Sequence, residues 1–248
     1  MDDGIAERYL RETRHSRAHL VGGRMDRNDQ PAWFKTYPEA PRVALPGLPG
    51  GESGADERDV FEVLERRRSV RAYAPPPLDL TELGALLWSA AGVTAREQGF
   101  ALRAAPSAGA LYPIEHYVAV HHVTGVDPGV YHYAVLDRAL ELVRGGDTRR
   151  PLAHAALDQR VAAFADAVFI WTAVLARSRW KYGQRFVRYI FLDAGHIAEN
   201  VALAAVALGL GTCQIAAFFD DEAAALLGVD PDEEPVVYMT TVGRPARS

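Results

Sequence analysis

Only one cysteine, Cys213, occurs among the 248 residues. A single thiol cannot form a disulfide within the chain, and it excludes a cysteine-rich metal site. Because disulfides are rare in the reducing cytoplasm, their absence fits a cytoplasmic protein. Residues 1–15 carry charges of both signs and no apolar run, so they do not resemble a secretory signal. We therefore expect the protein to act in the cytoplasm.

The chain also has little excess charge. Its 27 lysine and arginine residues and 32 aspartate and glutamate residues give a formal net charge of −5, and the basic residues are scattered. This pattern predicts neither a nucleic-acid surface nor a polybasic membrane patch. A small molecule or a peptide is the expected partner.

Long uncharged runs are rare as well, with one exception. Residues 201–219 contain no charge, and these 19 residues are about enough to span a bilayer. Gly209 and Gly211 interrupt the run with a signal that ends a helix. We therefore expect a buried helix followed by a buried strand, and no membrane span.

Two common nucleotide-binding motifs are missing from the sequence. There is no Walker A motif, and no glycine fingerprint of a dinucleotide-binding unit follows a predicted strand. These absences disfavour the parallel-sheet nucleotide-binding folds. What is present is a chain that is 49% hydrophobic, which is enough for a sizeable core.

The chain divides into two regions at about residue 58. Residues 1–58 show little periodicity, are rich in Arg, Pro and Gly, and end in PGLPGGESGADE (46–57), which is typical of a flexible connector. The aromatic and proline residues of 31–46 favour an extended segment packed on a surface. We predict an N-terminal extension, 1–58, that packs on a core domain of residues 59–248.

The core domain alternates predicted helices with predicted strands. A capping box at Asp79 and Glu82 begins a helix that Gly92 ends, and a helical pattern covers about 183–208. Three consecutive strands with turns between them indicate an antiparallel meander. The sequence thus predicts an α+β domain, with a mainly antiparallel sheet flanked by helices and a long central helix. The other predicted elements are helices at 60–64, near 151–160 and at 222–227, a loop at 95–113, and strands at 114–123, 129–136, 138–145, 167–175, 213–219 and 235–243.

Three short motifs contain residues suited to ligand binding. RRRSVR at 66–71 combines guanidinium groups with a hydroxyl, a combination that binds phosphate. APSAGALYP at 105–113 is a loop of small residues that lets the backbone approach a flat ligand. RWKYGQR at 179–185 places a lysine beside a tyrosine. Each motif has an ordinary alternative: a solvated charged face, a plain turn and a polar helix start.

Taken in order, these motifs resemble a known family. RRRSVRAY, PSAGALYP, RWKYGQRFVRYIFLDAGHIAENVALAAVALGLG and CQIAAFFD are similar to the nitroreductase-like flavoproteins, and specifically to their SagB-type thiazole/oxazole dehydrogenase branch. The resemblance covers roughly residues 58–243, and FKTYPEAPRVALP near the N-terminus is also similar to that branch. It implies a nitroreductase-like fold, FMN as cofactor, and an intertwined homodimer that binds the flavin at the subunit interface.

The resemblance also implies a set of flavin-binding residues. The arginine motif matches the family's clamp on the FMN phosphate and ribityl chain, with Arg244 as a substitute for the basic residues that ordinary nitroreductases carry near their C-terminus. The small-residue loop matches the segment near the isoalloxazine, where ordinary nitroreductases carry an asparagine and a glutamine, and the strand end at 215–217 matches backbone that faces the ring. The residues are Arg67, Arg68, Ser69, Arg71 and Arg244 at the phosphate, and Ser107, Ala108, Gly109, Ile215, Ala216 and Ala217 at the ring.

In the dehydrogenase branch the matching lysine–tyrosine pair, here Lys181 and Tyr182, is catalytic. Oxidising a thiazoline or oxazoline ring removes a proton from one ring carbon and a hydride from its neighbour, so the site needs a base opposite the flavin. A lysine acts as a base where its charge is disfavoured, and we expect burial near Arg177, Arg179 and Arg185 to achieve this. Tyr182 would relay the proton or orient the lysine.

The resemblance therefore implies an FMN-dependent dehydrogenase that oxidises azoline rings in a ribosomally made peptide. O2 is the expected acceptor that regenerates the flavin, and a cyclodehydratase is the expected partner. Two alternatives stay open. One is an NAD(P)H-dependent reductase of nitro, quinone or enone compounds on the same fold, and the other is a flavin-bearing or empty scaffold subunit of a peptide-modifying synthetase.

For the other polar residues we expect structural roles or none in catalysis. We expect His196 to be a buried helix residue, because Gly195 beside it indicates close helix packing. If His121 and His122 lie in the predicted strand, they point to opposite faces and cannot share a metal, and no metal site is predicted. Cys213 is expected in the core. Asn200 matches a recurrent asparagine of the family's long helix, without an assigned role.

Overall fold

The chain's fold is taken from a computed structural model. The residues that it describes are 5–13, 26–47, 60–97 and 99–246. The connector predicted at 46–57 lies almost entirely outside the described residues, and so does the predicted domain boundary at residue 58.

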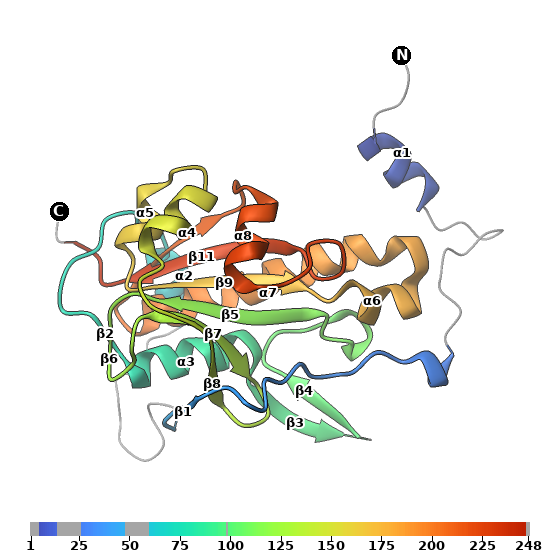
Figure 1. Cartoon of the computed structure of the whole chain (residues 1–248), viewed down its shortest axis with the longest axis horizontal. Helices are drawn as coiled ribbons and strands as arrows, with labels where there is room; N and C mark the ends of the chain where they lie inside the picture. Colours follow the sequence, from blue (N-terminus) through green and yellow to red (C-terminus); the bar gives the residue numbers. More distant parts are fainter. Residues whose placement is uncertain (1–4, 14–25, 48–59, 98, 247–248) are drawn as a thin grey trace.

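A seven-stranded sheet forms the centre of the molecule, in the order β1-β8-β7-β5-β9-β11-β10 (Figure 1). All neighbouring strands in this sheet are antiparallel. The strands are β1 (Arg42–Ala44), β5 (Ile114–Val120), β7 (Gly129–Ala134), β8 (Ala139–Gly145), β9 (Ala167–Ala173), β10 (Gly211–Ile215) and β11 (Val236–Gly243). Because β5, β7 and β8 are adjacent, the predicted meander is confirmed.

The sheet separates two layers of helices (Figure 1). Side chains alternate along a strand, so Val118 and Val120 of β5 pack with α3 and α7, whereas Tyr117 and Ala119 pack with α4, α5 and α8. The predicted fold class, an antiparallel sheet flanked by helices, is therefore confirmed. The helices of these layers are α3 (Leu80–Ala91), α7 (Phe186–Ala207), α4 (Arg149–Ala155), α5 (Arg160–Phe164) and α8 (Asp220–Leu227).

Helix α3 begins and ends at the residues that the sequence indicates. The Asp79 carboxylate accepts a hydrogen bond from the Glu82 amide (2.8 Å), and the Glu82 carboxylate accepts one from the Asp79 amide (3.0 Å). The backbone N–H of Gly92 donates to the Trp88 carbonyl and closes the last turn. Both ends satisfy backbone groups that a helix leaves without an internal partner.

A long helical segment packs on the same face of the sheet as α3. It consists of α6 (Leu175–Tyr182), the 3₁₀ turn η3 (Gly183–Arg185) and α7. Its length and composition would suffice to cross a bilayer, but it packs on α3, β10 and β11 as a core helix. The uncharged run at 201–219 is a helix followed by a strand, as predicted. Lys181 and Tyr182 end α6 rather than begin the long helix, because Gly183 has a positive φ of 52° and breaks the segment there.

Three predicted elements differ from the structure. The loop expected at 95–113 contains a hairpin, β3 (Val93–Glu97) and β4 (Phe100–Arg103), whose strands are short and bury no side chain fully, so the alternation of Val93 and Ala95 with polar residues is too brief to identify a strand. The helix near 151–160 is divided into α4 and α5, because Leu157 and Asp158 adopt left-handed conformations (φ 54° and 57°). The strand expected at 213–219 starts two residues earlier and ends at Ile215. The remaining elements are α1 (Ile5–Glu12), η1 (Arg27–Asp29), α2 (Val60–Arg66), β2 (Leu78–Asp79), η2 (Ala108–Ala110) and β6 (Val123–Thr124).

A buried charged network crosses the sheet from β1 to α6. The His132 ring lies between two carboxylates, with Nε2 2.9 Å from Glu115 and Nδ1 3.0 Å from Glu141. Arg177 of α6 pairs with Glu115 (2.5 Å), and Arg42 of β1 pairs with Glu141. These groups are almost fully buried except Arg42, so each charge depends on its neighbours for compensation.

Candidate functional site

The arginine motif runs alongside the first residues of β10. Ser69 forms a parallel bridge with Thr212, and the Val70 amide donates to the Thr212 carbonyl (2.7 Å). A Cβ at Gly211 would lie 2.6 Å from Cγ2 of Val70, so this close approach requires a glycine at position 211. The motif predicted to bind phosphate is therefore fixed to one end of the strand whose other end is predicted to face a flavin.

The arginines of this motif differ in what they contact. Arg68 donates to the carbonyls of Glu65 (2.8 Å) and Arg67 (2.7 Å) at the end of α2. Within the described part of the chain, Arg67 and Arg71 form no ion pair, and Arg71 is exposed. Guanidinium groups without a carboxylate partner, next to the exposed Ser69 hydroxyl, fit a phosphate group.

Arg244 is engaged with other groups of the protein. Its Nη2 lies 2.8 and 3.0 Å from the two carboxylate oxygens of Glu82, and its Nε donates to the Pro76 carbonyl (3.1 Å). The Glu82 carboxylate already compensates the charge of this guanidinium. A contact between Arg244 and phosphate therefore stays a prediction, and it would require that the ion pair be shared or broken.

The structure brings the small-residue loop and the lysine–tyrosine pair together. A Cβ built on Gly109 would lie 2.5 Å from the Tyr182 hydroxyl and 2.6 Å from Nζ of Lys181. Gly109 also has a φ of +63°, which favours glycine. Because this position has no side chain, the terminal groups of Lys181 and Tyr182 reach the backbone of the loop.

The surroundings of the pair favour a protonated tyrosine. Lys181 and Tyr182 are both half-buried, so the lysine is more exposed than expected. Nζ of Lys181 lies 5.5 Å from the centroid of the Tyr182 ring, which packs on Tyr189 at 4.5 Å between centroids. Burial, and then the nearby Tyr189 and Asp193, raise the pKa of Tyr182. Its hydroxyl therefore carries a proton that it can donate at neutral pH.

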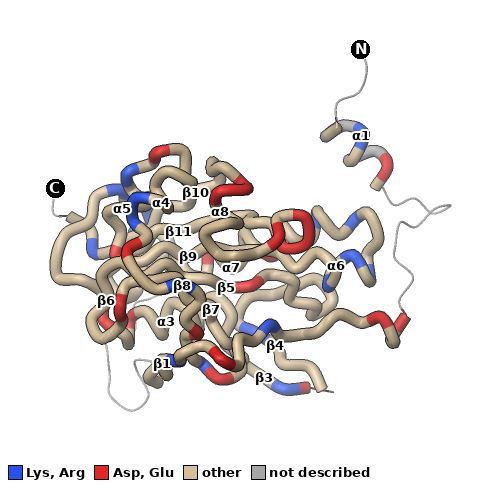
Figure 2. Tube along the Cα trace, viewed as in Figure 1, with Lys and Arg blue, Asp and Glu red and all other residues tan. Residues whose placement is uncertain are grey.

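The three arginines expected around Lys181 bind other groups. Arg177 pairs with Glu115, Arg179 lies over the Phe186 ring (5.2 Å), and Arg185 donates to the Tyr189 hydroxyl (3.0 Å). Figure 2 shows the basic residues gathered along α6 and the turn after it. They give this end of the molecule a positive field.

Asp193 is a site residue that was not predicted. Its carboxylate accepts hydrogen bonds from the Ser107 hydroxyl (2.5 Å) and the Ala108 amide (3.2 Å). It is 4% exposed, and burial raises its pKa. A sequence signal did exist, because Asp193 is a charged residue on the apolar face that Ile190, Ala194 and Ile197 define on the long helix.

A small cavity lies behind this loop, next to Asp193. The volume that the centre of a water molecule can occupy in this cavity is about 10 Å³. Its lining includes Arg103, His116 and Tyr112. His116 is fully buried, and burial, followed by the charge of Arg103, lowers its pKa to about 3. The ring is therefore neutral, and neither of its nitrogens has a hydrogen-bond partner among the described residues.

The end of β10 offers exposed backbone. Ile215 is buried and ends the strand, whereas Ala216 and Ala217 after it are exposed. Gln159 donates to the Ala217 carbonyl (2.9 Å), which fixes this turn. Small exposed residues here leave room for a flat ligand to approach the main chain.

Other predicted residues are placed as follows. The expectation for His196 is wrong: it is exposed, and a Cβ at Gly195 would meet nothing within 4 Å, because this side of α7 faces away from the core. Cys213 is buried, as predicted. His121 is buried whereas His122 is exposed. Asn200 donates to the Ser89 carbonyl (3.1 Å) and so ties α7 to α3.

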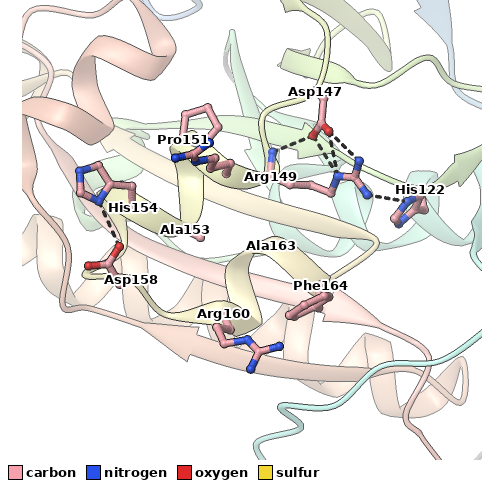
Figure 3. A pocket seen from close by; sticks show the side chains of 11 residues that line it. His122, Asp147, Arg149, Pro151, Ala153, His154, Asp158, Arg160, Ala163 and Phe164 are labelled. Atoms are coloured by element: carbon pink, nitrogen blue, oxygen red, sulfur yellow. Dashed lines mark hydrogen bonds and ion pairs between the residues drawn. The ribbon is translucent and has the colours of Figure 1, made fainter.

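A groove of about 890 Å³ lies elsewhere, along α4 and α5 (Figure 3). Its charged groups are largely paired with one another, Arg149 with Asp147 and His154 with Asp158. None of the predicted site residues lines it. We place the candidate site at Lys181 instead, because several reactive and polar groups converge there.

Comparison with known proteins assigns the fold to a family. The nitroreductase family model matches residues 64–244. MJ1384 of Methanocaldococcus jannaschii, a protein named for this family, is 42% identical over 189 residues, which cover 76% of this chain and 92% of that protein. A family structure from Anabaena variabilis is 31% identical with a TM-score of 0.76, and the match covers 97% of this chain but only 47% of that one. The trifolitoxin-processing protein TfxB of Rhizobium leguminosarum bv. trifolii is 33% identical over 148 residues, 57% of this chain and 39% of TfxB. The chain thus belongs to the nitroreductase family.

Proposed function

We propose that the protein is an FMN-dependent dehydrogenase that oxidises thiazoline or oxazoline rings in a ribosomally made peptide. The observation that carries the proposal is the meeting of Lys181, Tyr182 and the Gly109 backbone at one point. A reductase that receives its electrons from a nicotinamide needs no amine base at this point, whereas the removal of a ring proton does. These residues lie in two of the four motifs that carry the resemblance to the SagB-type branch.

A relative supports a peptide as the substrate. TfxB is named for the processing of trifolitoxin. This chain matches less than half of TfxB, so the whole activity of that protein is not carried over. We propose from the shared segment that this protein modifies a peptide in physical association with a cyclodehydratase. This role fits both the sequence motifs and the relatives.

Proteins of the nitroreductase family bind flavin. The residues that fit FMN here are Arg67 and Arg71, which have no ion pair with the described residues, for the phosphate, and the backbone of 107–109 and 216–217 for the ring. When bound, FMN supplies the acceptor for the hydride that the substrate ring loses.

Side chains of the protein would accept the proton that the substrate ring loses. Nζ of Lys181, in its uncharged form, would take the proton from the ring carbon next to the one that loses the hydride. The protonated Tyr182 hydroxyl would donate a hydrogen bond to the amine or the ring, and so orient them. Because Gly109 has no side chain, both terminal groups lie against the backbone of the loop, and the azoline ring would meet them there.

We also propose that the protein acts as a homodimer. Large apolar side chains are exposed on α7, where Phe191 and Leu192 are 59% and 58% accessible, and on α2, where Val60 and Leu64 are exposed. Exposed apolar groups on two core-domain helices are typical of a surface that a second copy covers.

The proposal is tested with the FMN-loaded protein, a cyclised azoline peptide and O2. We expect Lys181→Ala to keep its bound FMN and to lose roughly 10²- to 10⁴-fold in turnover, the usual contribution of a general base. Arg150→Ala, a change of an exposed basic residue on α4 in the other helical layer, is the control and should keep its activity. Turnover is followed by the 2 Da mass loss per oxidised ring.

Three results would each contradict a part of this proposal. Full azoline oxidation by Lys181→Ala would exclude the lysine as base. Rapid flavin reduction by NADH or NADPH, without any reaction of the azoline peptide, would identify a reductase instead. A purified protein that cannot be loaded with flavin would favour a scaffold subunit.

A further inference from the structure

We infer that Asp193 is the positioning residue of this site: its carboxylate holds the 107–109 turn at the place where Lys181 and Tyr182 meet it. The effect on turnover rests on the proposed function, whereas the contacts that hold the turn do not. Asp193 lies on α7, more than 80 residues from the loop in sequence, so it acts as a tertiary clamp.

The turn has no cap of its own. Residues 108–110 form the 3₁₀ turn η2, whose N-cap residue, Ser107, makes no side-chain bond to the turn. The first N–H groups of a helical turn have no internal partner. One oxygen of Asp193 accepts the Ala108 amide and the other accepts the Ser107 hydroxyl, so a residue distant in sequence replaces the missing cap.

The turn also needs an external hold because its backbone is strained. Ala110 and Tyr112 have positive φ angles of 54° and 46°, which are unfavourable for residues with a side chain. The Ser107 hydroxyl oxygen accepts the Tyr112 amide (2.9 Å) while its proton goes to Asp193. The clamp therefore holds the amides of both Ala108 and Tyr112, and Gly109 lies between these two residues.

The charge state of Asp193 decides whether the clamp is complete. The groups that face it are Ser107 and Ala108 of the loop, Tyr182 of α6, His196 of its own helix, and Arg103 and His116 around the small cavity. Burial is the largest influence and raises the pKa of Asp193. A protonated carboxyl would lose one of its two acceptors, so the clamp should weaken at a higher pH than an exposed aspartate would require.

Hydrogen exchange tests the contacts without reference to activity. In Asp193→Ala we expect the Ala108 and Tyr112 amides to exchange at least about fivefold faster, because each lost hydrogen bond is worth about 1 kcal/mol. Asp193→Asn should lie between this variant and the unaltered protein, since its amide oxygen can still accept the Ala108 amide. Ser107→Ala should release the Tyr112 amide and leave the Ala108 amide protected.

Glu199→Ala is the matched control, because it removes an exposed carboxylate from the same helix. It should leave both amides unchanged. If Asp193→Ala and Asp193→Asn keep the exchange rates of the unaltered protein, the clamp does not exist. If Asp193→Ala does not fold, Asp193→Asn and Ser107→Ala still decide between these outcomes.

Turnover then separates the clamp from the proposed function. The unaltered enzyme should lose activity on the acid side of its pH profile, and Asp193→Asn should have lower kcat, little change in KM and a flatter acid side. An identical profile in both proteins would overturn the positioning role. Absence of azoline oxidation in every variant, with the exchange results as expected, would overturn the function and leave the clamp in place.

Discussion

Gly109 shows how one missing side chain defines the site. Any larger residue there would place its Cβ against the polar ends of Lys181 and Tyr182, both of which are flexible enough to move aside. The consequence of a substitution is therefore a displaced pair of reactive groups rather than a disrupted core. A substitution of Gly109 can therefore distinguish an effect on turnover from an effect on folding.

Gly109→Ala should accordingly lower turnover more than stability. We expect a loss of about 1–2 kcal/mol in the free energy of unfolding from the left-handed backbone, and a reduction in turnover well beyond what that loss explains. Gly99→Ala is the matched control, because Gly99 also has a positive φ (+85°) but its Cβ would meet nothing within 4 Å. Urea unfolding and azoline turnover measure the two quantities. Equal turnover in the two variants would contradict the role of Gly109.

The sequence predicted some of the individual site residues and missed others. The family resemblance placed Lys181, Tyr182 and Gly109 among the site residues, and the structure shows them in contact. Asp193 was missed because its partners lie more than 80 positions away, and only the fold brings them together. His196 was expected to be buried on the evidence of a neighbouring glycine, but a glycine in a helix can equally lie on an open face.

Among the elements, β5, β7 and β8 are tied to α6 and β1 by the buried charged network. Burial alone would raise the pKa of Glu115, but the hydrogen bond from His132 and the charge of Arg177 hold it at about 2. In the unfolded chain the same carboxyl has its ordinary value of 4.5. The folded state therefore gains stability from the ionised carboxylate above about pH 4.5 and loses it as the pH falls toward 2.

This linkage predicts the acid sensitivity of the fold. Between pH 5 and pH 2 we expect the free energy of unfolding to fall by roughly 3 kcal/mol through Glu115. Glu115→Gln should be less stable at neutral pH and should lack this part of the pH dependence. Glu65→Gln, at an exposed position of α2, is the control. Urea midpoints across this range provide the measurement, and equal slopes in Glu115→Gln and the control would contradict the assignment.

The elements that the sequence predicted well have local signals. The capping box of α3 and the turns of the meander depend on residues that are neighbours in the chain. The hairpin β3–β4 shows only a brief apolar alternation and no fully buried side chain, and the break between α4 and α5 depends on two left-handed residues that carry no glycine signal. Local pattern therefore predicted the buried elements, while tertiary contacts determine the exposed ones.

For the whole molecule, the exposed apolar face of α7 predicts a homodimer. Light scattering or sedimentation should give a mass twice the 27.1 kDa of one chain. Phe191→Glu combined with Leu192→Glu should shift the protein toward the monomer, because a charge in an apolar interface costs several kcal/mol. Phe164→Glu, at a residue that is equally exposed (58%) on the opposite helical layer, should leave the mass unchanged. A monomeric mass for the unaltered chain would contradict the proposal.

The order of the strands could not be predicted from the sequence. The meander follows from neighbouring turns, but the insertion of β11 between β9 and β10 joins segments separated by up to 75 residues, as in the pair Ala167 and Val242 (242 − 167). No local pattern specifies such a pairing. The composition and the motifs identified the class of the fold, while the arrangement of the sheet required its long-range contacts.

The three residues of β1 have a consequence for solubility. By pairing with β8, they cover backbone N–H and C=O groups that would otherwise form an open sheet edge, and Arg42 of β1 shields the buried Glu141. Open edges of this kind join to other chains and cause aggregation. A short strand from the N-terminal segment thus covers part of β8 and leaves an edge of only three residues on this side of the sheet, which gives another chain little backbone to pair with.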